Sequence, residues 1–216
     1  MGRSWLSRGE HHYVSGAGAD ARYLIQARDR RNGGNQRAGV GDPNSRLGRY
    51  KGPVPADPEQ FREVFGRFAT GVAVVTTAGP AGAGGMTANA MCSLSLQPLL
   101  ALVCFENAAR TLPIVREHGR FAINVLAAEQ VEQARLFASK LPEREKLEST
   151  PHRLHEGVPL IDGALAWAIC EVREQFAGGD HTIVIGEVID LGLGEGEPLL
   201  FYGGRYRKLA ASGESR

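Results

Sequence analysis

Short strand-like runs that alternate with glycine-rich turns constrain most strongly how residues 72–209 can fold. β-Branched and alternating apolar residues mark the strands, and clusters of Gly, Pro and Asp mark the turns. Helical periodicity is confined to two main stretches, which are too few to cover both faces of a parallel sheet. The sequence therefore predicts a mainly β fold with flanking helices, an antiparallel closed or split β-barrel. The strand-like runs are residues 72–77, 85–98, 99–105, 121–126, 164–176, 181–193, 198–204 and 205–209.

Two stretches have the spacing of amphipathic helices. Residues 57–58 are an Asp-Pro pair, which is typical of an N-cap followed by the first helical position. An apolar stripe, a pattern that ordinarily faces a core, then follows at Phe61, Val64, Phe65 and Phe68. The second helix is expected over residues 128–140, with a buried side formed by Val131, Ala134, Leu136 and Phe137. Residues 78–85 are expected to form a loop, residues 108–120 are a mixed segment, and residues 141–157 are expected to form an exposed charged loop.

Charge separates the first quarter of the chain from the rest. Residues 1–55 contain ten Lys and Arg against four Asp and Glu, whereas residues 56–216 contain fifteen against twenty. The N-terminal segment is rich in Gly, Arg, Asn and Ser and cannot bury enough apolar surface to offset the entropy of ordering it. We therefore expect a disordered basic tail at 1–55, a folded domain at 56–210 and a short tail at 211–216. The arginines of the tail have no interleaved aromatic residues, so nucleic-acid binding is not expected.

The composition favours a protein of the cytoplasm. No run approaches the roughly 18 apolar residues that a membrane helix needs, and the N-terminus lacks the apolar core of a signal peptide. The three cysteines, Cys92, Cys104 and Cys170, lie singly within apolar runs, as thiols in a reducing compartment do. No membrane partner is expected.

The segment Gly85–Pro98 has the length of a strand but unusually polar contents. Alternate residues of a strand share a face, and Thr87, Asn89, Ser93 and Ser95 fall on one of the two alternating sets. Small hydrogen-bonding side chains next to glycines suit a flat polar ligand better than a packed core. A half-exposed antiparallel strand would also have a polar outer face, so this segment by itself leaves both interpretations open.

Two further clusters are placed to contact a ligand. Asp180 and His181 follow a glycine-rich turn, so the imidazole should lie at the rim of whatever the barrel encloses. Residues 203–204 are a Gly-Gly pair that is expected to turn a hairpin presenting Arg205 and Tyr206, which can stack on a nucleotide and hydrogen-bond to it. Each cluster is equally compatible with an ordinary surface turn.

Several common catalytic patterns are not supported. Residues 192–196 read GLGEG after a strand, but Glu197 and Pro198 follow in place of a helix N-terminus that could receive a pyrophosphate. His152 and His155 have no matching Cys, Asp or Glu pair, so a metal site is not expected.

Five motifs in a fixed order resemble one known family. They are FATGVAVVTT, GMTANAMCSLSLQP, FAINVL, GDHTIVIGEV and PLLFYGGRYRKL. Residues 61–209 thereby resemble the short-chain flavin reductases, the reductase components of two-component flavin-dependent monooxygenases. The resemblance implies the FMN-binding split-barrel fold, a homodimer, and a reaction that uses NADH or NADPH to reduce FMN or FAD.

The resemblance also assigns residues to the two ligands. It places along the flavin Thr87, Ala88, Asn89, Ala90, Met91, Ser93 and Leu94. Toward the flavin phosphate and the flavin edge it places Asn107, Ala109, Arg110, Thr111, Lys140 and Leu141. His181 matches the family histidine near the nicotinamide and is the expected catalytic residue, and the hairpin that helps to bind the pyridine nucleotide is matched by Gly204, Arg205 and Tyr206.

The resemblance implies that hydride passes from the nicotinamide to the flavin, and that the reduced flavin then diffuses to a partner monooxygenase. Such chemistry needs two stacked rings at short distance more than it needs acid and base groups. The alternative is a module that binds FMN tightly and transfers electrons without releasing flavin. The sequence leaves open FMN against FAD, NADH against NADPH, and the identity of the oxygenase.

Overall fold

The structure, a computed structural model, describes residues 57–80 and 82–210. The predicted basic tail at 1–55 and the C-terminal tail at 211–216 lie outside the described residues, so the proposed domain boundaries stay predictions. Among the described residues no helix is long and apolar enough to cross a bilayer.

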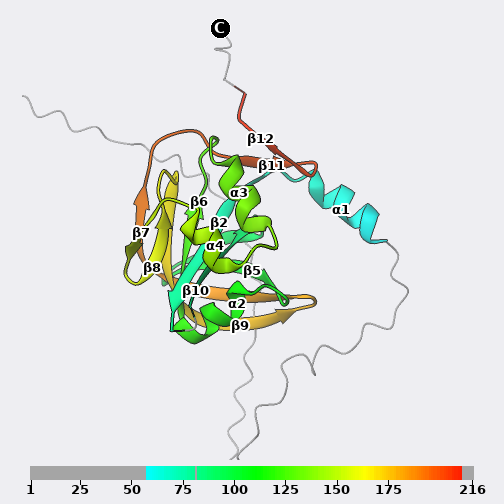
Figure 1. The fold of residues 1–216 in the computed structure, drawn as a ribbon. Helices are drawn as coiled ribbons and strands as arrows, with labels where there is room; N and C mark the ends of the chain where they lie inside the picture. The colour runs from blue at the N-terminus through cyan, green and yellow to red at the C-terminus, as the bar shows by residue number, and fades with distance from the viewer. Residues whose placement is uncertain (1–56, 81, 211–216) are drawn as a thin grey trace, which may run out of the picture. The chain divides into compact units, whose positions relative to one another are not determined.

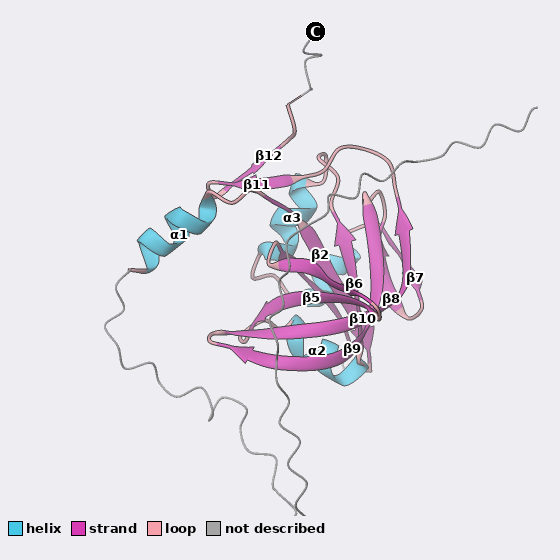
Figure 2. Cartoon of the chain, turned by 180° about the vertical axis from the view of Figure 1, so that it is seen from behind, coloured by secondary structure: helices cyan, strands magenta, loops and turns pink. Residues whose placement is uncertain are grey.

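Seven strands form one antiparallel sheet in the order β3-β2-β6-β9-β10-β5-β4 (Figure 1, Figure 2). Their bounds are β2 (Ala73–Gly79), β3 (Gly82–Ala88), β4 (Met91–Leu96), β5 (Leu99–Glu106), β6 (Arg120–Val125), β9 (Ala166–Gly178) and β10 (His181–Leu193). The two edge strands, β3 and β4, are consecutive in the chain and joined only by Asn89 and Ala90, so the sheet must curl until its edges meet. The Cys104 amide donates to the Ala90 carbonyl at 2.9 Å and ties this corner to β5. The predicted split barrel is confirmed.

Two small sheets and four short helices surround the barrel (Figure 1). One small sheet is formed by β1 (Thr70–Gly71), β11 (Leu200–Tyr202) and β12 (Arg205–Arg207), and the other by β7 (His152–His155) and β8 (Val158–Ile161). The helices are α1 (Pro58–Gly66), α2 (Thr111–His118), α3 (Val131–Ala138) and α4 (Glu143–Glu148). Residues 203–204 turn the predicted β11–β12 hairpin with φ of 58° and 74°, a conformation that glycine adopts readily.

The core explains why the first half of β2 is apolar. Ala73 and Val75 point into the barrel, where Phe105 and Phe121 meet edge to face with centroids 6.3 Å apart. Val72, just before β2, and Val74 point outward and pack in a second cluster with Leu126, which follows β6, and with Ala134, Phe137 and Leu147 of α3 and α4. Both faces of β2 are therefore buried, and no position on it needs to be polar for solvent.

Asn124 on β6 joins the barrel to the β7–β8 sheet through bonds that are fully buried. Its Nδ2 donates to the Val74 carbonyl at 3.1 Å and to Thr76 Oγ1 at 3.0 Å. Its Oδ1 accepts from the Ile161 amide at 2.9 Å. One amide side chain thus satisfies groups on β2 and on the residue that ends β8.

The polar segment Gly85–Pro98 is not one strand, so that prediction was wrong. β3 already begins at Gly82, inside the stretch predicted to be a loop, and ends at Ala88, and β4 begins at Met91 after the corner. The alternation therefore breaks at Asn89, and Thr87 does not share a sheet face with Ser93. A period of two cannot reveal a corner made of two residues that are themselves small or polar.

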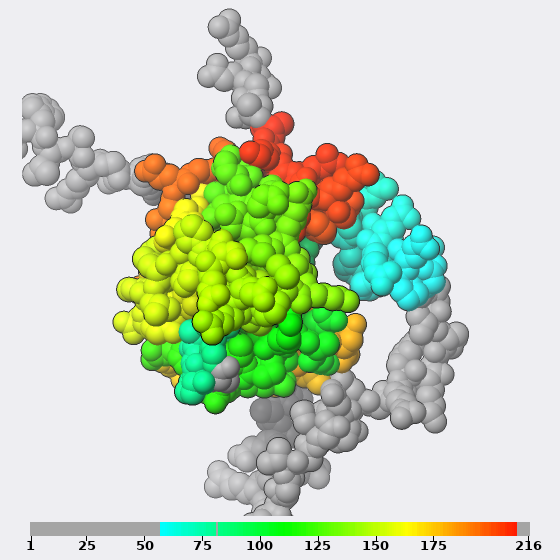
Figure 3. Space-filling view, in the orientation of Figure 1, coloured from blue at the N-terminus to red at the C-terminus, as the bar shows by residue number. Residues whose placement is uncertain are grey.

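The N-terminal helix is confirmed, but its apolar stripe is exposed. Asp57 Oδ1 accepts from the Glu59 and Gln60 amides at 2.7 and 3.0 Å, as the predicted N-cap requires. The stripe residues are 57–74% exposed, so within one chain they do not form the core that the periodicity predicted. Figure 3 shows α1 at the side of the folded body next to the C-terminal hairpin, where the Gly203 amide donates to the Gly66 carbonyl at 2.9 Å.

Two further segments are more ordered than the sequence predicted. The mixed stretch 108–120 contains α2, which buries Leu112, Ile114 and Val115. The expected exposed loop at 141–157 contains α4 and β7, and Lys146 on α4 is only 3% exposed. Both helices are short and carry charged residues on their outer sides, so their apolar periodicity spans too few turns to be distinctive.

We predict that Asn124→Ala lowers the free energy of unfolding by about 1–3 kcal/mol, because it leaves the buried Ile161 amide and Val74 carbonyl without that side-chain partner. Urea unfolding followed by fluorescence measures the change. Asn89→Ala is the matched control, since Asn89 is exposed and makes one side-chain bond of 3.3 Å to Thr70; it should cost less than about 0.5 kcal/mol. Equal losses in the two variants would contradict this role of Asn124.

Candidate active site

A cavity of about 720 Å³ lies where the barrel corner meets α2, α3 and α4. It gathers side chains from segments that are far apart in the sequence. Nine residues expected to meet the flavin or the nicotinamide line it: Thr87, Ala88, Asn89, Ala90, Ala109, Arg110, Thr111, Lys140 and His181. A volume of this size is typical of pockets for cofactors and other small ligands.

The remaining predicted site residues lie outside the lining of this cavity. Leu94 lies on β4, beyond the corner, and the same strand carries Met91 and Ser93, which border an apolar groove. Leu141 is adjacent to the lining residue Lys140. Gly204, Arg205 and Tyr206 lie on the C-terminal hairpin, where the Tyr206 ring packs on Phe201 with centroids 5.5 Å apart. Partial burial raises the pKa of the Tyr206 phenol, so this hydroxyl stays protonated near neutral pH.

The corner presents small and polar groups to the cavity. The Thr87 hydroxyl donates to the Ala134 carbonyl on α3 at 2.6 Å, which uses its proton and leaves its oxygen able to accept. Gly85 lets α3 approach β3, because a Cβ at this position would lie 2.7 Å from the Phe137 ring. Alanines at 88, 90, 108 and 109 then leave room for a flat ligand to approach the backbone.

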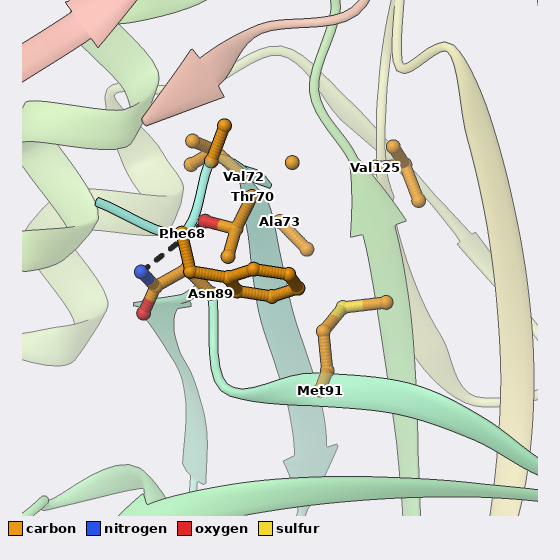
Figure 4. A pocket seen from close by; sticks show the side chains of 9 residues that line it. Phe68, Thr70, Val72, Ala73, Asn89, Met91 and Val125 are labelled. Carbon is orange, nitrogen blue, oxygen red and sulfur yellow. Dashed lines mark hydrogen bonds between the residues drawn. The ribbon is translucent and has the colours of Figure 1, made fainter. Parts of the chain in front are cut away.

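A second cavity of about 320 Å³ adjoins the corner (Figure 4). Asn89 lines both cavities and donates to Thr70 Oγ1 at 3.3 Å. Figure 4 shows the Phe68 ring reaching across this second cavity, whose wall also includes Met91 and Val125. The corner is thus lined by polar groups on one side and mainly by apolar groups on the other.

His181 occupies the rim of the larger cavity at the start of β10. Its Nδ1 lies 2.7 Å from Asp180 Oδ1, and this hydrogen bond is the main cause that lowers the pKa of the Asp180 carboxyl. An ionised carboxylate only accepts hydrogen bonds, so the proton of the neutral ring lies on Nδ1. Nε2 is then the ring nitrogen left to accept a hydrogen bond from a ligand.

Asn107, which is expected to lie toward the flavin phosphate, holds the turn that carries His181. Its backbone amide donates to the Asp180 carbonyl at 2.9 Å, and its side-chain Nδ2 donates to the Gly179 carbonyl at 3.2 Å. Its Oδ1 accepts from Thr182 Oγ1 at 2.7 Å. Asn107 is absent from the cavity lining described here, and its contacts are those of a residue that positions the β9–β10 turn.

The charges of the cavity suit an anionic ligand. Three cationic side chains line it, Arg110, Lys140 and Lys146, against the two carboxylates of Glu106 and Glu143. Cys104 also lines it, but burial, assisted by the nearby Cys92, raises the pKa of the Cys104 thiol. A protonated thiol is a poor nucleophile. The geometry therefore favours binding and orientation of a polar, negatively charged ligand over covalent catalysis.

Sequence reasoning missed Glu143, Lys146 and Cys104, which all line the cavity. Glu143 and Lys146 fall in the stretch predicted to be an exposed loop, and Cys104 falls in an apolar strand where burial is the usual explanation. The three-residue spacing of Glu143 and Lys146, which places both on one side of a helical turn, was the signal available.

Comparisons with known proteins find one family over most of the described residues. Residues 65–210 match the family model of the flavin reductase like domain. The NADH-dependent flavin reductase of a Rhodococcus species is 39% identical over 159 residues, which cover 72% of this chain and 89% of the relative. The reductase subunit HsaB of a flavin-dependent monooxygenase from Mycobacterium tuberculosis is 37% identical over 154 residues, covering 69% and 81%.

A solved structure has the same fold. The NADH:FAD oxidoreductase SgcE6 of Streptomyces globisporus, in complex with NAD and FAD fragments, is similar with a TM-score of 0.69 and 40% identity. The match covers 74% of this chain and 98% of that protein.

Proposed function

This chain belongs to the flavin reductase like family, and we propose on that premise that it is an NAD(P)H-dependent flavin reductase. It transfers a hydride from NADH or NADPH to FMN or FAD and supplies the reduced flavin to a monooxygenase. Of the relatives named above, one is an NADH-dependent flavin reductase, one is an NADH:FAD oxidoreductase, and one is the reductase subunit of a flavin-dependent monooxygenase. NADH and FAD are accordingly the first ligands to test.

The observation that carries the proposal is the shared cavity. The corner residues Thr87 to Ala90, the segment Ala109 to Thr111 and His181 come from three separate parts of the chain and line one space of about 720 Å³. Their convergence is not required for the barrel to close, since the corner alone joins the two edges.

The cavity fits a flavin by size and by the chemistry of its donors. The alanine-lined corner admits a flat ring, and the Thr87 and Asn89 side chains offer polar groups to its edge. Arg110 and Lys140 offer charge-assisted hydrogen bonds to a phosphate. When both ligands are bound, the nicotinamide supplies the hydride and the flavin accepts it.

The residues of the chain bind, orient and exclude water. His181 Nε2 would meet the nicotinamide at the rim, the Asp180 carboxylate keeps the ring in one tautomer, and Asn107 holds the turn that carries both. No side chain has to move a proton between the two ligands, because a hydride transfer needs mainly close and aligned rings.

The apolar groove beside β4 supports a homodimer. This groove of about 270 Å³ is lined by β4, β5, β6, β9 and β10; Leu96, which lines it, is 82% exposed, and Leu193 at the end of β10 is 88% exposed. The exposed stripe of α1 adds four more apolar side chains. A second copy of the chain covers these surfaces, because a two-fold interface buries the same apolar patch on both partners. Met91 lines both the groove and the cavity of Figure 4, so the interface adjoins the barrel corner.

The reduced flavin leaves by diffusion, since the cavity is open to solvent at the His181 rim, where that side chain is 43% exposed. The protein works in the cytoplasm, where thiols such as its three unpaired cysteines stay reduced.

We predict that the protein bleaches flavin absorbance when it is mixed with NADH under anaerobic conditions, measured by stopped flow with FMN and with FAD. Bleaching should be catalytic in the protein, with many flavins reduced per chain. Heat-denatured protein is the control. No bleaching with either flavin and either nucleotide would refute the enzyme, and bleaching limited to one tightly held flavin per chain would favour the electron-transfer alternative.

We predict that His181→Ala raises the KM for the pyridine nucleotide about tenfold and leaves the KM for flavin within about twofold, because the imidazole meets the nicotinamide only. Asn107→Ala should shift the same constant in the same direction by a smaller factor, since it acts through the β9–β10 turn. Steady-state kinetics with each substrate varied in turn measures both. Gln175→Ala, on β9 with its side chain on Arg116, is the control. An unchanged nucleotide KM in His181→Ala would contradict its role.

We predict that the protein is a dimer in solution and that Leu96→Arg makes it a monomer, because a two-fold interface would bury the new charge twice. Light scattering coupled to size-exclusion chromatography gives the mass. Leu154→Arg is the matched control, since Leu154 is 68% exposed on β7 and does not line the groove. A monomeric wild-type protein, or a dimeric Leu96→Arg variant, would contradict this interface.

A further inference from the structure

A single carboxylate joins three walls of the candidate cavity. Glu143, the first residue of α4, has a side chain that is 11% exposed. Its Oε2 accepts from the Gly85 amide on β3 at 2.9 Å and from Thr111 Oγ1 at the start of α2 at 3.2 Å. Its Oε1 accepts from Lys146 Nζ at 2.9 Å, and Arg110 Nε lies 3.6 Å away. Four donors from four different residues therefore converge on one side chain.

Arg110 extends this network to the mouth of the cavity. Its Nη2 donates to the Lys140 carbonyl at 2.9 Å and also to the Leu141 carbonyl. The guanidinium is thus fixed between Glu143 and the segment that follows α3, although its side chain is half exposed. A half-exposed arginine without such partners would sample several rotamers. Ordering it when a ligand binds would then cost free energy and weaken the binding of that ligand.

Lys146 makes the carboxylate necessary. The Lys146 side chain is 3% exposed, and the other acceptor of its ammonium is the Phe137 carbonyl at 3.4 Å. Without Glu143 it would be a buried cation with one long neutral hydrogen bond, which is costly. The backbone is shaped to admit the carboxylate, since a Cβ at Gly84 would lie 3.2 Å from Glu143 Oε2.

We propose that Glu143 is the positioning residue of the flavin phosphate site: it holds the Arg110 guanidinium so that the end of the cavity presents a fixed positive charge to the phosphate, while the buried Lys146 neutralises the charge of Glu143 itself. The proposal rests on the proposed function, because it takes flavin as the ligand. Glu143 itself does not touch the phosphate. The four groups that contact its carboxylate are hydrogen-bond donors of the protein, and a carboxylate facing a phosphate directly would repel it.

Replacing this carboxylate by an amide breaks the arrangement without changing its size. Gln has one accepting oxygen and one NH₂ group, and at position 143 the NH₂ would face either Lys146 and Arg110 or Gly85 and Thr111, which are all donors. Arg110 then loses its only carboxylate contact among the described residues and keeps the Lys140 and Leu141 carbonyls, so the charge that meets the phosphate is less firmly fixed.

The test compares ligands that differ in the phosphate. Binding of FMN, FAD and riboflavin to Glu143→Gln is followed by fluorescence quenching. We expect the Kd for FMN and FAD to rise about tenfold, while the Kd for riboflavin, which has the same ring and ribityl chain but no phosphate, stays within about twofold. Glu145→Gln is the matched control, since Glu145 is exposed on the same helix, and it should bind all three ligands like the wild type.

A second variant separates positioning from general stability. Glu143→Gln/Lys146→Met removes both buried charges, so it should recover most of the thermal stability lost in Glu143→Gln. It should still bind FMN about tenfold more weakly than the wild type, because Arg110 remains without its carboxylate. Lys146→Met alone keeps the carboxylate next to Arg110 and should raise the Kd for FMN by less than about threefold.

The outcomes distinguish the two proposals. The proposed function is refuted if the wild-type protein quenches the fluorescence of neither FMN nor FAD. Wild-type protein that binds riboflavin as tightly as FMN, or a Glu143→Gln variant that weakens all three ligands equally, overturns the role of Glu143. The role of Glu143 is also overturned if the double variant recovers FMN affinity as well as thermal stability. It is overturned equally if Lys146→Met alone loses as much FMN affinity as Glu143→Gln does.

Discussion

The structure depends on the two-residue corner at Asn89 and Ala90. It joins the two edge strands of a seven-stranded sheet, so the sheet has to close on itself and the barrel core has to form inside it. The same closure turns the backbone outward at one point, between β3 and β4. Small side chains are needed there for the chain to turn, and those side chains leave space for a ligand. The geometry that completes the barrel therefore also creates the candidate site.

The helices complete what the corner begins. α3 packs on β3 through Phe137, which requires glycine at 85, and α4 brings Glu143 to the same strand. α2 starts at the cavity with Thr111 and Arg110. These three short helices have little stability of their own and are held by the packing on the barrel. A site that is formed on a closed sheet and held by the largely buried Glu143 carboxylate is rigid. A rigid site suits the alignment of the flavin and nicotinamide rings in the proposed reaction.

The two sides of the corner have different surroundings. One side is the cavity with three cationic side chains, and the other leads past Met91 to an apolar groove and the exposed leucines of β4. A small charged ligand and a second protein copy require these opposite properties. Because only Ala90 separates Asn89 from Met91, the proposed ligand site and the proposed dimer interface adjoin each other at the corner.

Local patterns in the sequence predict the class of fold, the start of α1 and the C-terminal hairpin, because strand propensity, the Asp-Pro cap and the Gly-Gly turn act locally. The sequence also pointed to Thr87, Asn89 and His181, since polar residues in apolar surroundings are visible along the chain. Three features became visible only in the folded chain: Gly85–Pro98 bends in two, the stripe of α1 stays exposed, and Asn107 holds a turn. It alone brought Glu143 and Lys146 into the cavity. Those features depend on contacts between residues up to 75 positions apart, as for Asn107 and Thr182, and such contacts leave no periodic signal in the sequence.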